Sequence, residues 1–464
     1  MHPIQRAIRS AGAAAVAIAL TACGSPGGSA PSFGPAGESQ VLPQMMHGIR
    51  HHGSSGKIKH VVIIVQENRS FNDLFYGFPG ATTATYGYDT HGNKITLQPV
   101  GLETTWDIEH DSQGFLAACN GTGSFPGTDC QMNGFDNEYW GCGHYGSKCP
   151  NSNPPYSYVP NSETQPYFAM AKQYALADQM FASNYDASSF ISHQYIIAAQ
   201  AASAVNFPDG SWGCEGGPSD VVPMVTQKRT ISGSEQACFT DDTLGSELDN
   251  ASLSWAFYTS EVNGRDVGQI WSAYQANEAV YNGPDWSKDV IWPQTNIFSD
   301  LTNGKLRSVS WVTPTWTNSD HAGSGSKTGP SWVTSLVNAI GKSKYWDSTA
   351  IFIFWDDYGG WYDPVAPALV DYDGLGMRIP MIIISPYAKK GYISETPYEH
   401  GSILKFAEDQ FGLPRLAASD TRANSPADAF DFSKPPRKFH AIKSQYDKAY
   451  FLHQAPDYHA PDDN

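Results

Sequence analysis

The chain has 464 residues, enough for one large α/β domain with insertions or for about two or three smaller domains. Lys and Arg number 29 against 46 Asp and Glu, so the formal net charge is −17. Because an acidic surface repels nucleic acid and anionic headgroups at long range, and no basic run offsets it, nucleic acid is not an expected partner.

The first 23 residues have the composition of an export signal. Arg6 and Arg9 supply positive charge, and residues 11–20 form an apolar run that is too short to span a bilayer. The run ends in Leu20-Thr21-Ala22-Cys23, which resembles the bacterial lipobox. We therefore expect a cleaved signal peptide and a protein anchored to the bacterial cell envelope, in the periplasm or at the cell surface, through lipid on Cys23. The alternative is an ordinary secretory signal with a chance cysteine.

The chain after the signal divides by composition into three parts. Residues 24–57 are rich in Gly, Ser, Pro and Ala, which is typical of a flexible tether. Strand and helix patterns then alternate from residue 58 to 432 without an internal repeat, so we expect one catalytic domain there. Residues 433–464 are polar and predict a C-terminal tail.

Hydrophobic periodicity predicts the elements of that domain. The predicted strands are 61–65, 252–258, 307–313, 350–355 and 380–385. The predicted helices are 167–181, 192–202, 243–250, 268–278, 331–345 and 400–413. This alternation predicts an α/β fold with a largely parallel central sheet flanked by helices.

Six cysteines remain when Cys23 is set aside, and an even count in an exported protein indicates disulfides. Proximity pairs Cys119 with Cys130, Cys142 with Cys149, and Cys214 with Cys238, so that insertions would be stapled by disulfides. Zinc binding is the weaker alternative because no Cys-x-x-Cys spacing occurs.

Two of the predicted strands lead into oxygen-bearing side chains. Residues 61–65 lead to Glu67 and Asn68, and residues 350–355 stop on Asp356 and Asp357. Because ligands of open α/β sheets bind beyond the carboxyl ends of the strands, we expect one shared site. Three carboxylates and an amide oxygen suit a divalent cation. The alternative is that each side chain only caps a turn.

Other candidates lie in turns and loops. The turn Asp186-Ala187-Ser188-Ser189-Phe190 precedes a predicted helix, so a serine there is either an N-cap or a nucleophile. The positive end of the helix and a metal would both favour use of the hydroxyl. His110 and His321 lie in polar loops where an imidazole can bind phosphate or protonate a leaving group, and a solvated side chain is the alternative for each.

Several segments carry a resemblance to a known family: ENRSFNDLFYG from residue 67, WDIEH from 106, SDH from 319, WDDYGGWYDP from 355, RIPMIIISPYAKKGYIS from 378 and HGSILKFAEDQFGL from 400. The chain resembles the bacterial phosphoesterase family that joins phospholipases C with exported acid phosphatases, which is similar in fold to the alkaline phosphatase superfamily. The resemblance covers most of residues 58–413, and the segments occur in family order.

The resemblance implies a set of site residues. Glu67, Asn68, Asp356 and Asp357 would bind one divalent metal ion of unknown identity. Ser189 would touch the metal and become a phosphoserine intermediate. His110, His321 and Asp320 would lie around the phosphate.

The chain departs from the family pattern at four positions. Ile191 and Ser192 stand where Pro-Asn is common, and Tyr358 and Pro364 stand where histidines are common. Loss of two imidazoles would shift the substrate preference or the pH optimum, or reduce activity.

The resemblance leaves three functions open. The first is a metal-dependent acid phosphatase or phosphomonoesterase. The second is a phospholipase C that cleaves phosphocholine-type headgroups. The third is a lipid-anchored surface binding protein that has lost turnover. A sulfatase is disfavoured, because the serine turn lacks the Cys/Ser-x-Pro-x-Arg pattern.

Overall fold

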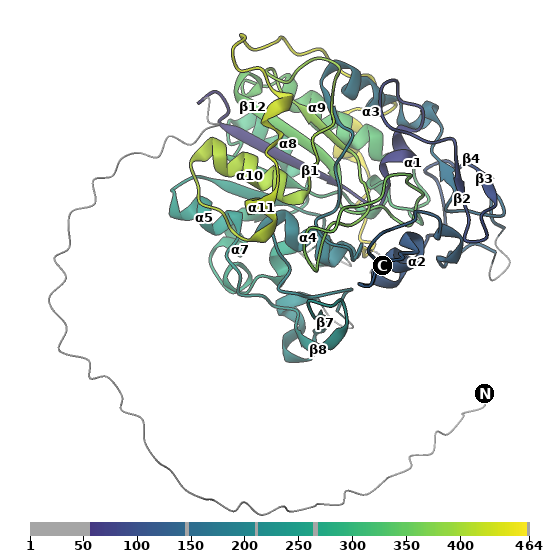
Figure 1. Cartoon of the computed structure of the whole chain (residues 1–464). Helices are drawn as coiled ribbons and strands as arrows, with labels where there is room; N and C mark the ends of the chain where they lie inside the picture. Colours follow the sequence, from purple (N-terminus) through teal and green to yellow (C-terminus); the bar gives the residue numbers. More distant parts are fainter. Residues whose placement is uncertain (1–55, 144–147, 209–211, 263–267, 462–464) are drawn as a thin grey trace, which may run out of the picture. The chain divides into compact units, whose positions relative to one another are not determined.

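The computed structural model describes residues 56–143, 148–208, 212–262 and 268–461 (Figure 1). The predicted signal peptide, the lipobox with Cys23 and nearly all of the predicted tether lie outside these residues. In the described part of the chain, no helix is both long enough and apolar enough to cross a bilayer.

The core is a central sheet with eight strands among the described residues. In spatial order they are β10 (Val290–Ile291), β9 (Trp255–Tyr258), β11 (Val309–Val312), β1 (His60–Gln66), β12 (Thr349–Trp355), β13 (Met381–Ile384), β6 (Ala175–Ala177) and β14 (Tyr392–Ser394). Neighbouring strands pair in parallel except at β13, which is antiparallel to both β12 and β6. The predicted α/β fold with a largely parallel sheet is confirmed.

Three two-stranded sheets lie outside the central sheet. They pair β2 (Tyr86–Tyr88) with β3 (Lys94–Thr96), β4 (Gln98–Pro99) with β5 (Ser157–Tyr158), and β7 (Val221–Val225) with β8 (Ile231–Gln236). The β7–β8 hairpin forms part of the insertion predicted between Cys214 and Cys238.

Helices cover both faces of the central sheet (Figure 1). The α-helices are α1 (Phe71–Phe75), α2 (Ser112–Cys119), α3 (Asn161–Gln173), α4 (Ser189–Ala198), α5 (Leu244–Asn250), α6 (Glu278–Tyr281), α7 (Asp285–Asp289), α8 (Asn296–Asn303), α9 (Gly329–Gly341), α10 (His400–Phe411), α11 (Ala418–Arg422) and α12 (Lys448–His453). Along β1, Val61, Ile63 and Val65 pack in one apolar cluster with α4, α5 and α10. Val62 and Ile64 pack on the opposite face with α1, α3, α8 and α9. Burial on both faces explains the unbroken apolar run in this strand.

Two predicted helices differ from the structure. The helix expected over 167–181 begins earlier and ends at Gln173, because Ala175–Ala177 pairs as β6 with β13 and β14. The helix expected over 268–278 consists of two short 3-10 helices, Gln269–Trp271 and Ala273–Ala276, followed by α6. In the first case long-range strand pairing overrides helix propensity.

The structure contains the three disulfides that proximity suggested: Cys119–Cys130, Cys142–Cys149 and Cys214–Cys238. Their loops span 11, 7 and 24 residues of sequence separation. Three such bonds indicate an exported protein, since reducing compartments rarely preserve them.

The segment after residue 432, expected as a tail, packs against the domain as far as it is described. Ile442 and Phe451 are buried in the same apolar cluster as α9. Further on, residues 454–459, here called the C-terminal strap, contact the 3-10 helix Trp316–Asn318. The Asp457 carboxylate accepts from the Thr317 amide at 2.7 Å, and the His459 ring stacks on Trp316 with 4.8 Å between ring centroids. Trp316 in turn lies 4.6 Å, centroid to centroid, from the His321 ring, so the strap supports the loop that carries that histidine.

Candidate active site

The carboxyl ends of β1 and β12 bring the predicted strand-end side chains together. These strands are parallel neighbours, and Gln66 pairs with Trp355 in the register, so Glu67 and Asp356 each follow their strand at the same level. The Asp356 amide donates to the Gln66 carbonyl at 3.1 Å, which continues the pairing to the rim of the sheet. The prediction that two distant strand tips meet is confirmed.

Asn68 takes an unusual backbone conformation at this rim. Its φ is +55°, in the left-handed region, and its amide donates to Asp356 Oδ1 at 3.1 Å. Gly359 packs directly on it: a Cβ at Gly359 would lie 2.1 Å from the Asn68 carbonyl oxygen, and Gly359 itself has a φ of +61°. The glycine is therefore required for the approach of the two loops.

Ser189 is the first residue of α4 and its hydroxyl faces the strand ends. Its Oγ lies 3.5 Å from Asp357 Oδ2, to which it donates, and 3.4 Å from Asn68 Nδ2. Asp186 shapes the turn before the helix, because its carboxylate accepts from the backbone amides of Ser188 and Asn206. Ser188, not Ser189, is the N-cap residue, and its side chain makes no capping hydrogen bond. The Ser189 hydroxyl is thus not used as a cap.

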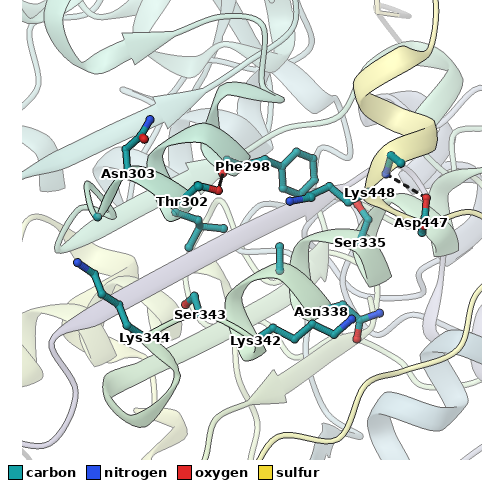
Figure 2. Close-up of a pocket in the computed structure, with 14 residues that line it drawn as sticks. Phe298, Thr302, Asn303, Ser335, Asn338, Lys342, Ser343, Lys344, Asp447 and Lys448 are labelled. Carbon is teal, nitrogen blue, oxygen red and sulfur yellow. Dashed lines mark hydrogen bonds between the residues drawn. The ribbon is translucent and has the colours of Figure 1, made fainter.

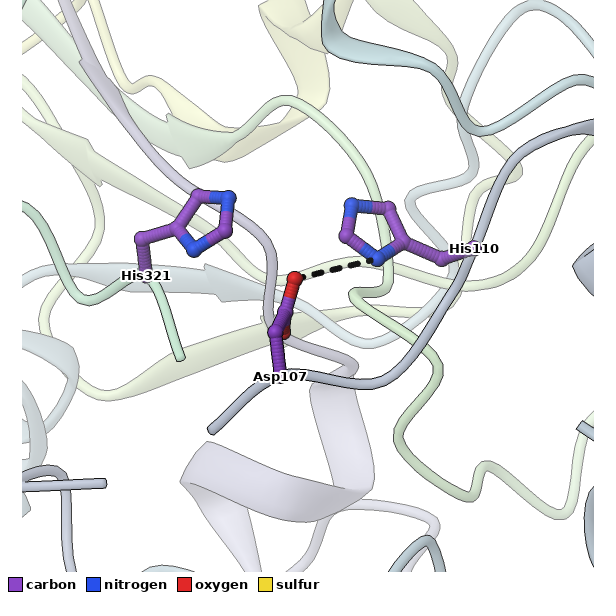
Figure 3. Close-up of side chains that lie close together, drawn as sticks. All are labelled: Asp107, His110 and His321. Atoms are coloured by element: carbon purple, nitrogen blue, oxygen red, sulfur yellow. Dashed lines mark ion pairs between the residues drawn. The ribbon is translucent and has the colours of Figure 1, made fainter. Parts of the chain in front are cut away.

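His110 and His321 face one another beside this cluster, with 6.0 Å between ring centroids (Figure 3). In each ring, Nδ1 forms a hydrogen bond with a backbone carbonyl oxygen. For His110 this is the oxygen of Ile108 at 2.5 Å, and for His321 it is the oxygen of Ala322. His110 Nε2 lies 2.5 Å from Asn68 Nδ2, which links the ring to the strand ends. The structure therefore brings both predicted histidines to the site.

Asp107 joins these two histidines and was missed by sequence reasoning. Its Oδ2 lies 3.9 Å from His110 Nδ1, and ligand atoms of Asp107, His110 and His321 all lie within 4.8 Å of one another (Figure 3). Its position three residues before His110 in the same loop was the available signal.

Asp320 is placed differently from the other predicted residues. Its carboxylate oxygen Oδ2 accepts from Tyr167 Oη at 2.7 Å and from Trp355 Nε1 at 3.1 Å, and its backbone carbonyl accepts from Arg69 Nε at 2.7 Å. Among the described residues, these hydrogen bonds tie Asp320 to α3 and to the end of β12. It braces the loop of the adjacent His321.

His193 is a second residue that sequence reasoning did not place in the site. Its Nε2 lies 3.3 Å from Glu67 Oε1 and 3.7 Å from Asp356 Oδ2. Because residues i and i+4 share a helix face, the spacing from Ser189 to His193 was a signal for this position.

Burial dominates the electrostatics of the strand ends. The side chains of Glu67, Asp356 and Asp357 are fully buried. Burial and the charge of Asp356 raise the pKa of Glu67 and of Asp357 well above their ordinary values. Burial also opposes ionisation of Asp356, but the interaction with His193 and the hydrogen bonds around it outweigh that effect and lower the Asp356 pKa. Burial lowers the pKa of His193 to about 4, so this imidazole is neutral at pH 7.

This cluster fits a divalent cation. Glu67 Oε1, Asn68 Oδ1 and Asp356 Oδ2 are buried and accept no hydrogen bond from the described residues. Ligand atoms of Glu67, His193 and Asp356 all lie within 4.8 Å of one another. Three buried carboxylates cannot all ionise without a compensating positive charge, and a divalent ion would supply it.

The positions that depart from the family pattern have defined surroundings. Tyr358 donates from its hydroxyl to the buried Glu138 at 2.7 Å, with its ring 6.5 Å from that of His110. Ile191 is buried in an apolar cluster, and Ser192 donates to Asn184 Oδ1 at 3.5 Å. Pro364 follows Asp363, whose carboxylate binds Arg378 at 3.0 Å.

A surface cavity of about 720 Å³ lies away from this site, between α8, α9 and α12 (Figure 2). Its lining includes Gly304 and Lys344, which precede β11 and β12. The cavity therefore lies toward the amino ends of these strands, whereas the candidate site lies at the carboxyl ends.

Comparisons with known proteins identify the family. The model of the Phosphoesterase family matches residues 58–414. Phospholipase C A of Mycobacterium tuberculosis is 23% identical over 428 residues, which cover 82% of this chain and 78% of that protein. The non-hemolytic phospholipase C of Burkholderia pseudomallei is 22% identical over 435 residues, covering 78% of this chain and 56% of that protein. A solved structure of an alkaline phosphatase superfamily protein from Vibrio parahaemolyticus matches with a TM-score of 0.37 and 12% identity, covering 80% of this chain and 72% of that one. The chain belongs to the Phosphoesterase family, and it is a hydrolase that acts on phosphoric esters.

Proposed function

We propose that the protein hydrolyses phosphoric monoesters through a phosphoserine formed on Ser189. The observation that carries the proposal is the position of the Ser189 hydroxyl at the start of α4, with Asp357 Oδ2 at 3.5 Å and Asn68 Nδ2 at 3.4 Å. The helix N-terminus favours negative charge on a bound phosphate.

Each residue of the cluster has a role in this reaction. Ser189 Oγ attacks phosphorus, the bond from phosphorus to the ester oxygen breaks, and the hydroxyl proton passes to Asp357. His110 or His321 gives a proton to the leaving alcohol, since both rings face the same space. Water then attacks the phosphoserine and the bond from phosphorus to Ser189 Oγ breaks. Asp357 returns its proton to Oγ and the histidine takes a proton from the water, so phosphate is released and the serine and both proton carriers are restored.

Glu67, Asn68, Asp356, Asp357 and Ser189 would hold one divalent metal ion. When bound, such an ion offsets negative charge on the nucleophile and on the phosphate oxygens. The fit rests on the unpartnered buried oxygens of Glu67, Asn68 and Asp356.

Two substrates of the same reaction class, a small phosphomonoester and a phospholipid, differ mainly in size. Ser189, His110 and His321 are all 0% exposed, which favours a small ester over a bulky lipid. A phospholipase C that cleaves phosphocholine-type headgroups is the second candidate, and the names of the Mycobacterium and Burkholderia relatives favour it.

Membrane attachment is a further part of the proposal. The lipobox-like sequence at Cys23 would anchor the exported protein by lipid, and the catalytic domain would extend over residues 58–432. Fractionation of cells that express the wild-type chain or Cys23→Ser tests this part: the variant should leave the membrane fraction.

Two chromogenic substrates and two serine variants test the reaction. The wild type should release nitrophenol from p-nitrophenyl phosphate faster than from p-nitrophenyl phosphorylcholine, and cleavage of the second alone would favour the phospholipase. Ser189→Ala should lower kcat by more than about 10³-fold. Ser192→Ala, which changes a buried serine one turn away, is the matched control and should keep most of the activity. Rapid quenching and mass spectrometry should find phosphate on the Ser189 peptide. Unchanged hydrolysis in Ser189→Ala would instead assign the measured activity to a contaminating enzyme and support the non-catalytic binding protein.

A further inference from the structure

Among the described residues, His193 is the only histidine that contacts both Glu67 and Asp356. It reaches the strand ends from the same helix face as Ser189, and its Nε2 lies 3.3 Å from Glu67 Oε1, 3.5 Å from Glu67 Oε2 and 3.7 Å from Asp356 Oδ2. All three side chains are fully buried. The imidazole is therefore inside the oxygen cluster and not at its margin.

These separations match those of atoms that share a metal ion. With ligand bonds of about 2.1 Å, adjacent ligand atoms lie about 3.0 Å apart in an octahedral set and about 3.4 Å apart in a tetrahedral one. Glu67 Oε1 and Asp356 Oδ2, the oxygens that face Nε2 at 3.3 and 3.7 Å, accept no hydrogen bond from the described residues. A cation between the three atoms would use all of them.

The other ring nitrogen, Nδ1, is buried and has no hydrogen-bond partner among the described residues. The contacts of the ring with the two carboxylates are all made by Nε2, so Nε2 is the atom that a cation between Glu67 and Asp356 would meet.

We infer that His193 supplies a nitrogen ligand, so that the site takes a transition-metal dication of the zinc or iron type in preference to Mg²⁺ or Ca²⁺. The inference rests on the proposed function for the presence of a metal, and it adds a ligand that the family resemblance does not. An all-oxygen set suits Mg²⁺, Ca²⁺ and Mn²⁺, whereas imidazole suits zinc, iron, nickel and copper.

In a competing role, His193 donates a hydrogen bond from Nε2–H to the two carboxylates, and its ring does not bind the metal. Affinity for zinc over magnesium does not separate these roles, because mixed nitrogen and oxygen sites generally favour zinc. The discriminating measurements are the nitrogen signal of the metal and the change in selectivity when the ring is removed.

The experiment uses full-length protein that has been stripped of metal with a chelator and reloaded. Pulsed electron paramagnetic resonance of the Cu²⁺-loaded wild type should show the remote-nitrogen coupling of a bound imidazole. In His193→Gln the coupling should disappear, and calorimetry should show zinc affinity reduced by about 10- to 100-fold with magnesium affinity changed much less. His110→Gln is the control, since it removes a nearby imidazole from the other histidine cluster, and it should keep the coupling.

Two results would overturn the inference: loss of the coupling in His110→Gln instead of His193→Gln, or equal zinc affinity in wild type and His193→Gln. If His193→Gln fails to fold, the Co²⁺-loaded His193→Cys variant replaces it. A thiolate-to-cobalt absorption band in that variant would place residue 193 on the metal, and its absence in folded protein would count against the inference. These readouts need no turnover. If the nitrogen coupling is seen but the protein hydrolyses neither substrate, only the proposed function is contradicted. If hydrolysis depends on Ser189 but no nitrogen coupling is seen, only this inference is contradicted.

Discussion

Replacement of Asp320 by alanine should test whether this residue braces the site or touches the substrate. The family resemblance places Asp320 around the phosphate, whereas its hydrogen bonds in the structure go to Tyr167 and Trp355. Its carboxylate is 1% exposed, and burial raises its pKa to about 6. At pH 7 the group is therefore mainly ionised and accepts two hydrogen bonds from buried donors.

The expected loss of stability follows from those two bonds. A hydrogen bond to a charged group contributes about 1.5–3 kcal/mol, so Asp320→Ala should lower the free energy of unfolding by about 3–6 kcal/mol. Asp320→Asn keeps one acceptor oxygen and should lose about half as much. Activity should fall in parallel with stability, because the change reaches the substrate only through the loop of His321.

Urea unfolding followed by tryptophan fluorescence measures the stability, and hydrolysis of p-nitrophenyl phosphate measures kcat. Asp300→Ala is the matched control, because Asp300 in α8 accepts a similar hydrogen bond at 2.7 Å from Tyr258 at the end of β9. It should cost stability without changing kcat. If Asp320→Ala unfolds at the wild-type urea concentration while kcat drops by 10³-fold or more, in the range that loss of a catalytic residue gives, the bracing role is wrong and Asp320 acts on the substrate.

Three further changes give distinct outcomes. Gly359→Ala should lower kcat strongly, since its Cβ would lie 2.1 Å from the Asn68 carbonyl oxygen. The control is Gly77→Ala, which has a similar φ of +69° and nothing within 4 Å of its Cβ, and it should cost only backbone strain. Equal kcat in the two variants would contradict the role of close packing. Burial raises the pKa of Asp186 to about 8 from 3.8, so folding takes up a proton between these values. The free energy of unfolding should therefore fall by up to about 1.4 kcal/mol per pH unit as pH rises from about 4 to 8. Asp186→Asn should flatten this pH dependence in urea titrations, and an unchanged dependence would assign the effect to other groups. Removal of the Cys214–Cys238 disulfide, whose cysteines are 24 residues apart, should lower the free energy of unfolding measured in urea by about 3 kcal/mol. A loss below about 1 kcal/mol would show that the disulfide does not restrain the unfolded chain.

The strand ends were predictable because parallel pairing forces their geometry. Once 61–65 and 350–355 are identified as buried strands of one parallel sheet, Glu67 and Asp356 follow at one edge, and the observed register places them there. The pairing of the six cysteines was predictable for a similar reason, since each bond is local in sequence.

The remaining parts depend on contacts that no local pattern encodes. The sequence Ala175-Leu176-Ala177 has the composition of a helix and becomes a strand only because β13 and β14 flank it. The role of Asp320 depends on Tyr167 and Trp355, which are distant in sequence. His193 was detectable from its i+4 spacing to Ser189 in α4, but the two carboxylates that it contacts follow strands β1 and β12, which are distant in sequence.

The C-terminal strap makes the order of synthesis matter for the site. His321 rests on Trp316, and Trp316 is covered by His459, which is more than a hundred residues further along the chain. A chain that has not yet released these residues lacks this cover, even when β1 and β12 are already paired and α4 is packed against them. The support of the histidine loop is therefore completed only after residues 454–459 have been released, so full assembly of the site requires nearly all of the described chain.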